Sequence, residues 1–282
     1  MALPDLDSVL SSNPFAIAGA SLPANFLQAF LVVMVVAVIV GTLFDIIHKG
    51  SAKYFFANMR NSKRKGRNVG GGEMASIAVQ TAVVDVLTSG EFCNQKRRVA
   101  HLLGMYGFVF YLVATVIMVF RYPAGASPAP AIWPTLWWIG ALMVLLGGYW
   151  FWFFIRVDVS AEGNSPFRLV RADLFILSLL ASVTLGVVWA ATGAGVGVWF
   201  WLYILATTVL FVGVPWSKFA HMFFKPAAAF EKRMSKANGT AQNLPTWSRE
   251  DPAQQRRHSM ELLRDAPMDM GLGIKRESPR HY

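Results

Sequence analysis

The sequence predicts an all-α integral membrane protein, in which a bundle of five transmembrane helices carries an extended C-terminal tail. Hydrophobic residues make up 55% of its 282 residues and charged residues only 15%, whereas about a quarter of the residues are charged in ordinary soluble domains. Several apolar runs approach the roughly 20 residues that a helix needs to cross a bilayer. The basic residues gather beside these runs, so the net charge of +10 indicates membrane topology and no nucleic-acid partner.

Five apolar segments are long enough to be interpreted as membrane spans. The predicted spans are residues 25–47, 99–120, 132–155, 174–191 and 198–214. The third span begins with Trp133, Trp137 and Trp138, a pattern typical of the aromatic belt at a membrane interface. The links between the second and third spans, and between the fourth and fifth, are short and rich in Gly, Ala and Pro. These links are therefore expected to be tight turns.

The distribution of Lys and Arg predicts the orientation of the chain. Segment 49–98 holds ten of them, whereas residues 1–24, 122–131 and 192–197 hold none. Loops rich in Lys and Arg stay on the cytoplasmic side of a membrane. We therefore expect a multi-pass protein of the inner (cytoplasmic) cell membrane, with its N-terminus outside and its C-terminus in the cytoplasm.

The same reasoning divides the chain into three parts. Residues 1–24 are expected to form an external segment, residues 25–225 the five-helix membrane domain, and residues 226–282 a cytoplasmic tail. Within the cytoplasmic loop 49–98, the apolar residues of 74–87 predict an amphipathic helix that lies on the membrane surface or against a partner. The tail has mixed charge and no strong periodicity, so we expect it to be extended.

Two histidines are the most informative residues of the sequence. His101 lies at the start of the second predicted span, and His221 follows the end of the fifth. Two imidazoles from two helices at equal depth suit the axial ligands of one six-coordinate haem. The neighbouring cations would face the haem propionates; they are Arg97, Arg98 and Lys218.

The cysteine content restricts the cofactor further. Cys93 is the single cysteine and no Cys-x-x-Cys-His motif occurs, so a haem would be bound non-covalently and the chain alone cannot supply an iron–sulfur cluster.

Other interpretations of these residues stay open. A boundary histidine can simply face lipid headgroups, and His48, one turn after Asp45, could replace either ligand. Gly104 and Gly107, which follow His101, could admit a flat macrocycle or could serve plain helix packing.

At these residues the chain resembles the cytochrome b membrane subunits of the respiratory nitrate reductase gamma type, in the branch found in heterodisulfide-reductase-type and sulfur-metabolism complexes. The matching motifs are Asp85-Val86-Leu87, Arg97-Arg98-x-x-His101, and Pro215-Trp216-Ser217-Lys218-Phe219-x-His221-Met222 with Pro226. The resemblance covers residues 25–226. Within that branch, the short basic tail and the lack of an N-terminal ferredoxin domain are most similar to the membrane anchor of adenylylsulfate reductase in sulfur oxidisers.

The resemblance implies a quinone-linked cytochrome b, which passes electrons between the quinone pool and a cytoplasmic iron–sulfur and flavin redox complex. The fullest form of the family holds two haems, and Tyr111 and Tyr203 stand at the depth of its outer ligands. We therefore expect one haem b, held by His101 and His221, and no bond-making chemistry in this chain. A haem-free anchor that only docks a soluble complex is the alternative. A small transporter is disfavoured because no span carries a charge in mid-membrane.

Overall fold

The computed structural model describes residues 6–48, 53–90, 92, 94–160, 163–170, 173–217, 221–241 and 244. Over these residues the chain is all-helical, without a strand. It divides into two compact units. The first unit comprises residues 1–42, 100–154 and 167–219, and the second comprises residues 43–99, 155–166 and 220–282.

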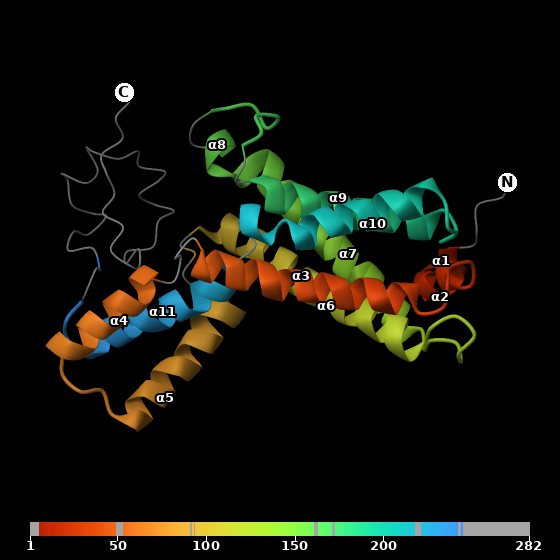
Figure 1. Ribbon diagram of the computed structural model, residues 1–282. Coiled ribbons are helices and arrows are strands. Elements are labelled where there is room, and N and C mark those ends of the chain that lie inside the picture. Colours follow the sequence, from red (N-terminus) through yellow and green to blue (C-terminus); the bar gives the residue numbers. More distant parts are fainter. Residues whose placement is uncertain are drawn as a thin grey trace. The chain divides into compact units, whose positions relative to one another are not determined.

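Four helices are long and apolar enough to cross a membrane (Figure 1). They are α3 (Phe26–Ile47), α6 (Gln95–Arg121), α7 (Ile132–Trp150) continued by a π-helix, η2 (Phe151–Ile155), and α9 (Leu174–Ala191). These helices confirm the first four predicted spans as long apolar helices. Only 17% of the most apolar window of α3 is buried within the chain, which leaves a wide apolar surface for lipid.

The fifth predicted span is shorter than expected. It forms α10 (Val198–Val212), an apolar helix of 15 residues, followed by a short 3₁₀ helix, η4 (Val214–Trp216). A helix of that length rises about 22 Å at 1.5 Å per residue, less than the roughly 30 Å of a bilayer core. α10 packs along α9 (Figure 1), and the fifth crossing stays a prediction.

The segment before α3 forms two short helices, α1 (Leu6–Ser11) and α2 (Pro14–Gly19). Asn13 caps α2, because its side-chain oxygen accepts hydrogen bonds from the backbone N–H groups of Phe15 and Ala16. The Asn13 amide also donates to the carbonyl oxygens of Met118 and Tyr122, at 3.3 and 2.9 Å. These bonds fix the segment to the C-terminal end of α6.

Glycines bring α6 and α7 into backbone contact. A Cβ atom on Gly107 would lie 2.8 Å from the carbonyl oxygen of Gly140, and one on Gly140 would lie 2.5 Å from the backbone nitrogen of Tyr111. About two turns of helix further, a Cβ on Gly147 would lie 2.7 Å from the carbonyl oxygen of Ala100. Only residues without a side chain permit this approach.

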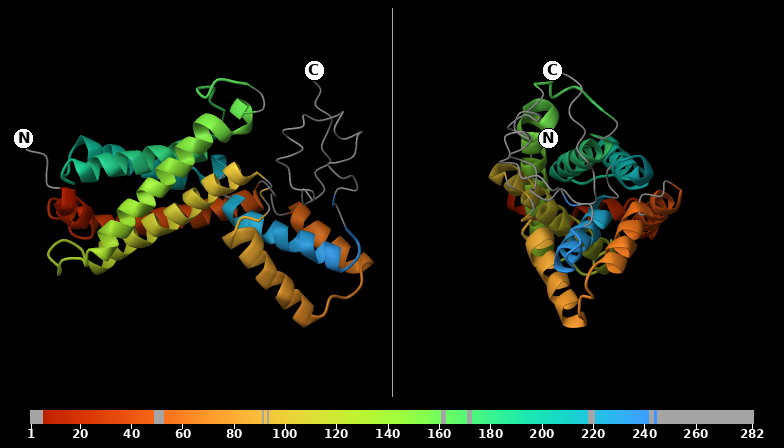
Figure 2. Two further views of the ribbon diagram at one scale, coloured as in Figure 1. Left: turned by 180° about the vertical axis from the view of Figure 1, so that it is seen from behind. Right: turned by 90° about the vertical axis from the view of Figure 1, so that its left-hand side faces the viewer.

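The second unit contains three longer helices outside the candidate spans. They are α4 (Lys53–Lys65), α5 (Gly71–Gln80) continued by a π-helix, η1 (Thr81–Leu87), and α11 (His221–Ala237). α11 contacts α4, α5 and η1, and lies between α4 and α5 (Figure 2). The short α8 (Val157–Ser160) also belongs to this unit.

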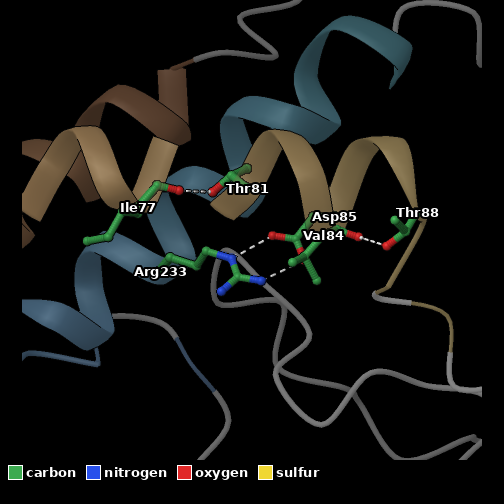
Figure 3. A network of polar contacts seen from close by, with 6 residues as sticks. All are labelled: Ile77, Thr81, Val84, Asp85, Thr88 and Arg233. Atoms are coloured by element: carbon green, nitrogen blue, oxygen red, sulfur yellow. Dashed lines mark hydrogen bonds and ion pairs between the residues drawn. The ribbon is translucent and has the colours of Figure 1, made fainter. Parts of the chain in front are cut away.

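Two polar contacts hold these helices together. The Arg233 guanidinium of α11 donates two hydrogen bonds to the Asp85 carboxylate of η1, at 2.6 and 2.9 Å (Figure 3). The Asn238 amide, directly after α11, donates to the backbone carbonyl and the hydroxyl of Ser62 in α4, at 3.1 and 2.6 Å. Asp85, singled out by the sequence motif, is therefore half of an ion pair.

The structure corrects one prediction in this unit and adds one helix. The predicted extended tail is wrong for residues 226–237, which are helical as part of α11. The segment 53–65 is a helix that the sequence did not predict. The predicted helix over 74–87 is confirmed as α5 and η1. Residues 245–282 of the tail lie outside the described residues.

Candidate haem-binding residues

His101 lies on α6, between one and two turns after the helix begins, and its side chain is exposed. α6 starts earlier than predicted because Asn94 caps it: the Asn94 side-chain oxygen accepts hydrogen bonds from the backbone N–H groups of Lys96 and Arg97, at 2.9 and 3.3 Å. The cap fixes the register of the helix, and so the direction in which His101 projects.

The two glycines after His101 serve different purposes. Gly107 packs against the backbone of α7, so helix packing explains it. A Cβ on Gly104 would meet nothing within 4 Å. Because residues three apart lie on one face of a helix, Gly104 leaves open space beside His101. That space can accept a flat ligand, and a larger residue at position 104 would fill it.

The two arginines before His101 are hydrogen-bonded to backbone carbonyls. Arg97 donates to Ile155, the last residue of η2, at 3.0 Å, and Arg98 donates to Thr88, directly after η1, at 2.8 Å. Both arginines therefore tie the start of α6 to the end of a π-helix, a type of segment that is frequent at functional sites. A guanidinium has five N–H donors, so a bond to one carbonyl does not prevent a bond to a propionate. The predicted role of Arg97 and Arg98 toward haem propionates therefore stays a prediction.

The second predicted ligand lies in the other unit. His221 is the first residue of α11, but its side chain and the whole of Lys218 lie outside the described part of the chain. His101 belongs to the first unit and His221 to the second. Their pairing around one iron therefore stays a prediction.

His48, the alternative ligand, directly follows α3 and is exposed. Its ring stacks on Phe44, with centroids 4.7 Å apart and planes at 22°. Among the described residues, no group of three or more His, Cys, Asp or Glu could hold a metal ion. A six-coordinate haem iron needs only two protein ligands, so this finding leaves the haem prediction open.

The depth predicted for outer haem ligands is filled by aromatic rings. The Tyr111 hydroxyl donates to the Tyr203 hydroxyl at 3.3 Å. Trp137 lies against Tyr111 with ring centroids 4.9 Å apart, and Trp189 stacks on Tyr203 at 5.4 Å. A Cβ on Gly186 would lie only 2.8 Å from the Tyr111 hydroxyl. We call these five residues the aromatic plug.

The free space beside the plug is small. A cavity of about 20 Å³ is bordered by residues that include Tyr203, Thr115 and Thr207, which is room for about one water molecule. The nearby polar side chains are hydrogen-bonded in pairs. The Trp137 indole N–H donates to the Thr115 hydroxyl at 3.1 Å, and the Ser182 and Thr207 hydroxyls are hydrogen-bonded at 2.7 Å. Within the first unit, the plug therefore does not line a vacated haem pocket.

Two tryptophans at the start of α7 lie elsewhere than their sequence pattern predicts. Trp137 and Trp138 were expected in an aromatic belt, but they are only 0% and 8% exposed, so that prediction is wrong for them. The signal that could have placed them inside is the run of small residues on the same helix, Gly140, Ala141 and Gly147, which marks the packed face of α7.

Comparisons with known proteins give one partial likeness. The chain is similar to citrate utilization protein B of Escherichia coli, with 28% identity over 172 residues that cover 54% of this chain and 44% of that protein. The chain thus spans less than half the length of this relative. No protein-family model matches the chain, and no solved structure matches it.

Proposed function

We propose that this protein is an electron-transfer subunit of the inner cell membrane, which holds a single haem b between His101 and His221. It would pass electrons between the quinone pool and a cytoplasmic iron–sulfur and flavin complex, such as adenylylsulfate reductase. The observation that supports this best is the contrast along α6. His101 projects from an exposed face with open space at Gly104, whereas the depth of a second haem is closed by the aromatic plug.

The described residues fit a haem as far as they reach. An exposed imidazole beside a glycine whose Cβ position is open offers both a ligand atom and room for a flat ring. The haem would supply one-electron chemistry, with a potential that depends on its axial ligands and its burial. In this chain, His101 and His221 would hold the iron, and Arg97, Arg98 and Lys218 would bind the propionates or the partner complex.

The proposal includes five crossings, with the N-terminus outside and the C-terminus in the cytoplasm. α10 is short for a span, but a short apolar helix is accommodated when the bilayer thins locally. Its 15 residues contain no charged residue, and its packing along α9 would carry it across beside a full-length span. Orientation then follows from the ten Lys and Arg residues of 49–98.

The first test is a reduced-minus-oxidised absorption spectrum of the purified full chain, together with haem content per chain. We expect a b-type spectrum at about one haem per chain, as a single histidine pair requires. His101→Ala and His221→Ala should each abolish the haem without preventing membrane insertion, and His48→Ala is the matched control that should keep it. Haem retained in both ligand variants would show that the ligand assignment is wrong.

A haem-free membrane anchor is the second candidate. One observation favours it: the exposed apolar side chains of α5 and η1, among them Val79, Val83 and Leu87, offer a surface for a soluble complex. A colourless wild-type protein that still co-purifies with soluble redox subunits would establish this function in place of the first.

A further inference from the structure

The helix α4 carries a positive charge that no acidic residue balances within the described part of the chain. Between positions 49 and 72 the sequence has seven Lys or Arg residues and no Asp or Glu. Arg67 pairs with Glu73. The five basic residues of α4 form no ion pair with any described carboxylate; they are Lys53, Arg60, Lys63, Arg64 and Lys65.

Ser62 attaches α4 to the rest of the second unit, and a neighbouring side of the helix is exposed. Ser62 is 4% exposed and accepts hydrogen bonds from Asn238. Beside it, Phe56 and Met59 are 53% and 39% exposed, and Arg60 and Lys63 are exposed as well. Positions 56, 59, 60 and 63 follow the spacing of one helical face, so two apolar side chains stand among cations.

The mixture of apolar and basic side chains on α4 is absent from α5 and η1, which are also exposed. From Met74 to Val84, α5 and η1 contain no charged residue, so they offer nothing to an ionic headgroup. α4 combines Lys and Arg with an exposed Phe, which is the composition of helices that lie in a membrane interface. Clusters of four to eight Lys and Arg directly after a transmembrane helix are typical of binding to anionic lipids.

The position of α4 in the chain matches this composition. α3, the first candidate span, ends at Ile47 and α4 begins at Lys53. Six residue steps reach about 20 Å at most, so the start of α4 is tethered close to the membrane surface. We propose that the exposed face of α4 lies on the anionic phospholipid headgroups of that membrane: Phe56 and Met59 enter the interface, and Arg60, Lys63 and Arg64 bind phosphate groups.

This contact would hold the second unit at the membrane through a lipid-dependent interaction, and it does not depend on haem binding. It can be measured in the full chain, reconstituted in nanodiscs with or without phosphatidylglycerol in phosphatidylcholine. A nitroxide is placed at Met59→Cys in a Cys93→Ser background, and its collisions with oxygen and with a water-soluble nickel chelate are compared. Asn61→Cys, exposed on another face of α4, is the matched control.

With phosphatidylglycerol present, the label at position 59 should shift toward oxygen and away from the nickel chelate, and the label at position 61 should not. The triple variant Arg60→Gln, Lys63→Gln, Arg64→Gln should reverse the shift. The ratio of membrane-bound to released α4 should fall about fivefold for each charge removed. Arg256→Gln, Arg257→Gln and Arg264→Gln remove the same charge elsewhere and should leave it intact. High salt should also release the helix, because the Debye screening length falls to about 3 Å at 1 M ionic strength.

Two results would overturn the proposal. One is a label at position 59 that stays equally accessible to the nickel chelate in both lipids. The other is protection at position 59 that develops only after a soluble redox complex is added, whatever the lipid, since α4 would then be a protein-docking helix.

Discussion

Replacing Gly107 with alanine should weaken the bundle, because the new methyl group would enter the backbone contact between α6 and α7. The added Cβ would lie 2.7 Å from the Met143 Cβ and 2.8 Å from both the Gly140 carbonyl oxygen and the Val144 nitrogen. Two of these three neighbours are backbone atoms of a helix, which cannot rotate away as a side chain can. The two helices must therefore move apart.

The size of the effect follows from two opposing terms. Overpacking of this kind costs about 1–3 kcal/mol, while alanine is favoured over glycine in a helix by about 1 kcal/mol. Gly104→Ala is the matched control, since a Cβ there meets nothing within 4 Å and only the helix preference remains. The difference between the two variants, about 1–3 kcal/mol of unfolding free energy, isolates the contact.

Unfolding of the full chain in mixed micelles of mild detergent and dodecyl sulfate, followed by tryptophan fluorescence, measures both variants. Gly107→Ala combined with Gly140→Ala should cost less than the sum of the single changes, because each new methyl group pushes the same two helices apart. The reasoning would be refuted if Gly104→Ala were as destabilising as Gly107→Ala, or if the double variant were strictly additive.

Three further predictions concern polar groups. Asp85→Asn breaks the bidentate pair with Arg233, so it should lower the unfolding free energy by about 1.5–3 kcal/mol, the range for hydrogen bonds to charged groups. It should also speed amide exchange in η1; unchanged exchange would contradict this. Burial raises the pKa of Glu231, whose side-chain oxygens have no hydrogen-bond partner among the described residues. The unfolding free energy of the wild type should therefore fall as pH rises from about 4.3, the ordinary pKa of glutamate, through the raised folded-state pKa. Glu231→Gln should remove that fall in a pH series of thermal unfolding, and a persistent fall would assign it to another group. Tyr111→Phe and Tyr203→Phe should each cost about 1 kcal/mol in detergent unfolding, and the double variant should cost less than their sum, because one shared hydrogen bond is lost; additive costs would show that the hydroxyls act separately.

The long apolar helices were predictable because a single physical signal determines them. For residues 132–155 and 174–191, hydropathy over about 20 residues is sufficient to predict a long apolar helix, and the observed helices end at the predicted residues. α10 shows the limit of this signal: its apolar run continues to Val214, but the α-helix ends at Val212. The chain then turns into the 3₁₀ helix that contains Pro215, since proline cannot donate the backbone hydrogen bond that helix continuation needs.

Two helices of the second unit, α4 and α11, were harder to predict because tertiary contacts stabilise them. α11 contains Pro226, which argues against a helix on local grounds. Its partners compensate: Arg233 binds Asp85 in η1, and Asn238 binds Ser62 in α4. These partners are 148 and 176 residues away along the chain. No periodicity within a short window reports such pairs.

The aromatic plug also illustrates what the sequence can and cannot say about a cofactor. The resemblance implies outer haem ligands at the depth of Tyr111 and Tyr203, and Tyr111 stands about 15 Å along α6 from His101. Tyrosines in place of histidines at that depth limit the proposed haem to one. The sequence could not show whether that depth is hollow. Trp189 stacked on Tyr203, and Gly186 against the Tyr111 hydroxyl, leave no space for a macrocycle there. Tyr111→His combined with Tyr203→His should therefore not add a second haem, and haem content above one per chain in that variant would show that the plug yields to a cofactor.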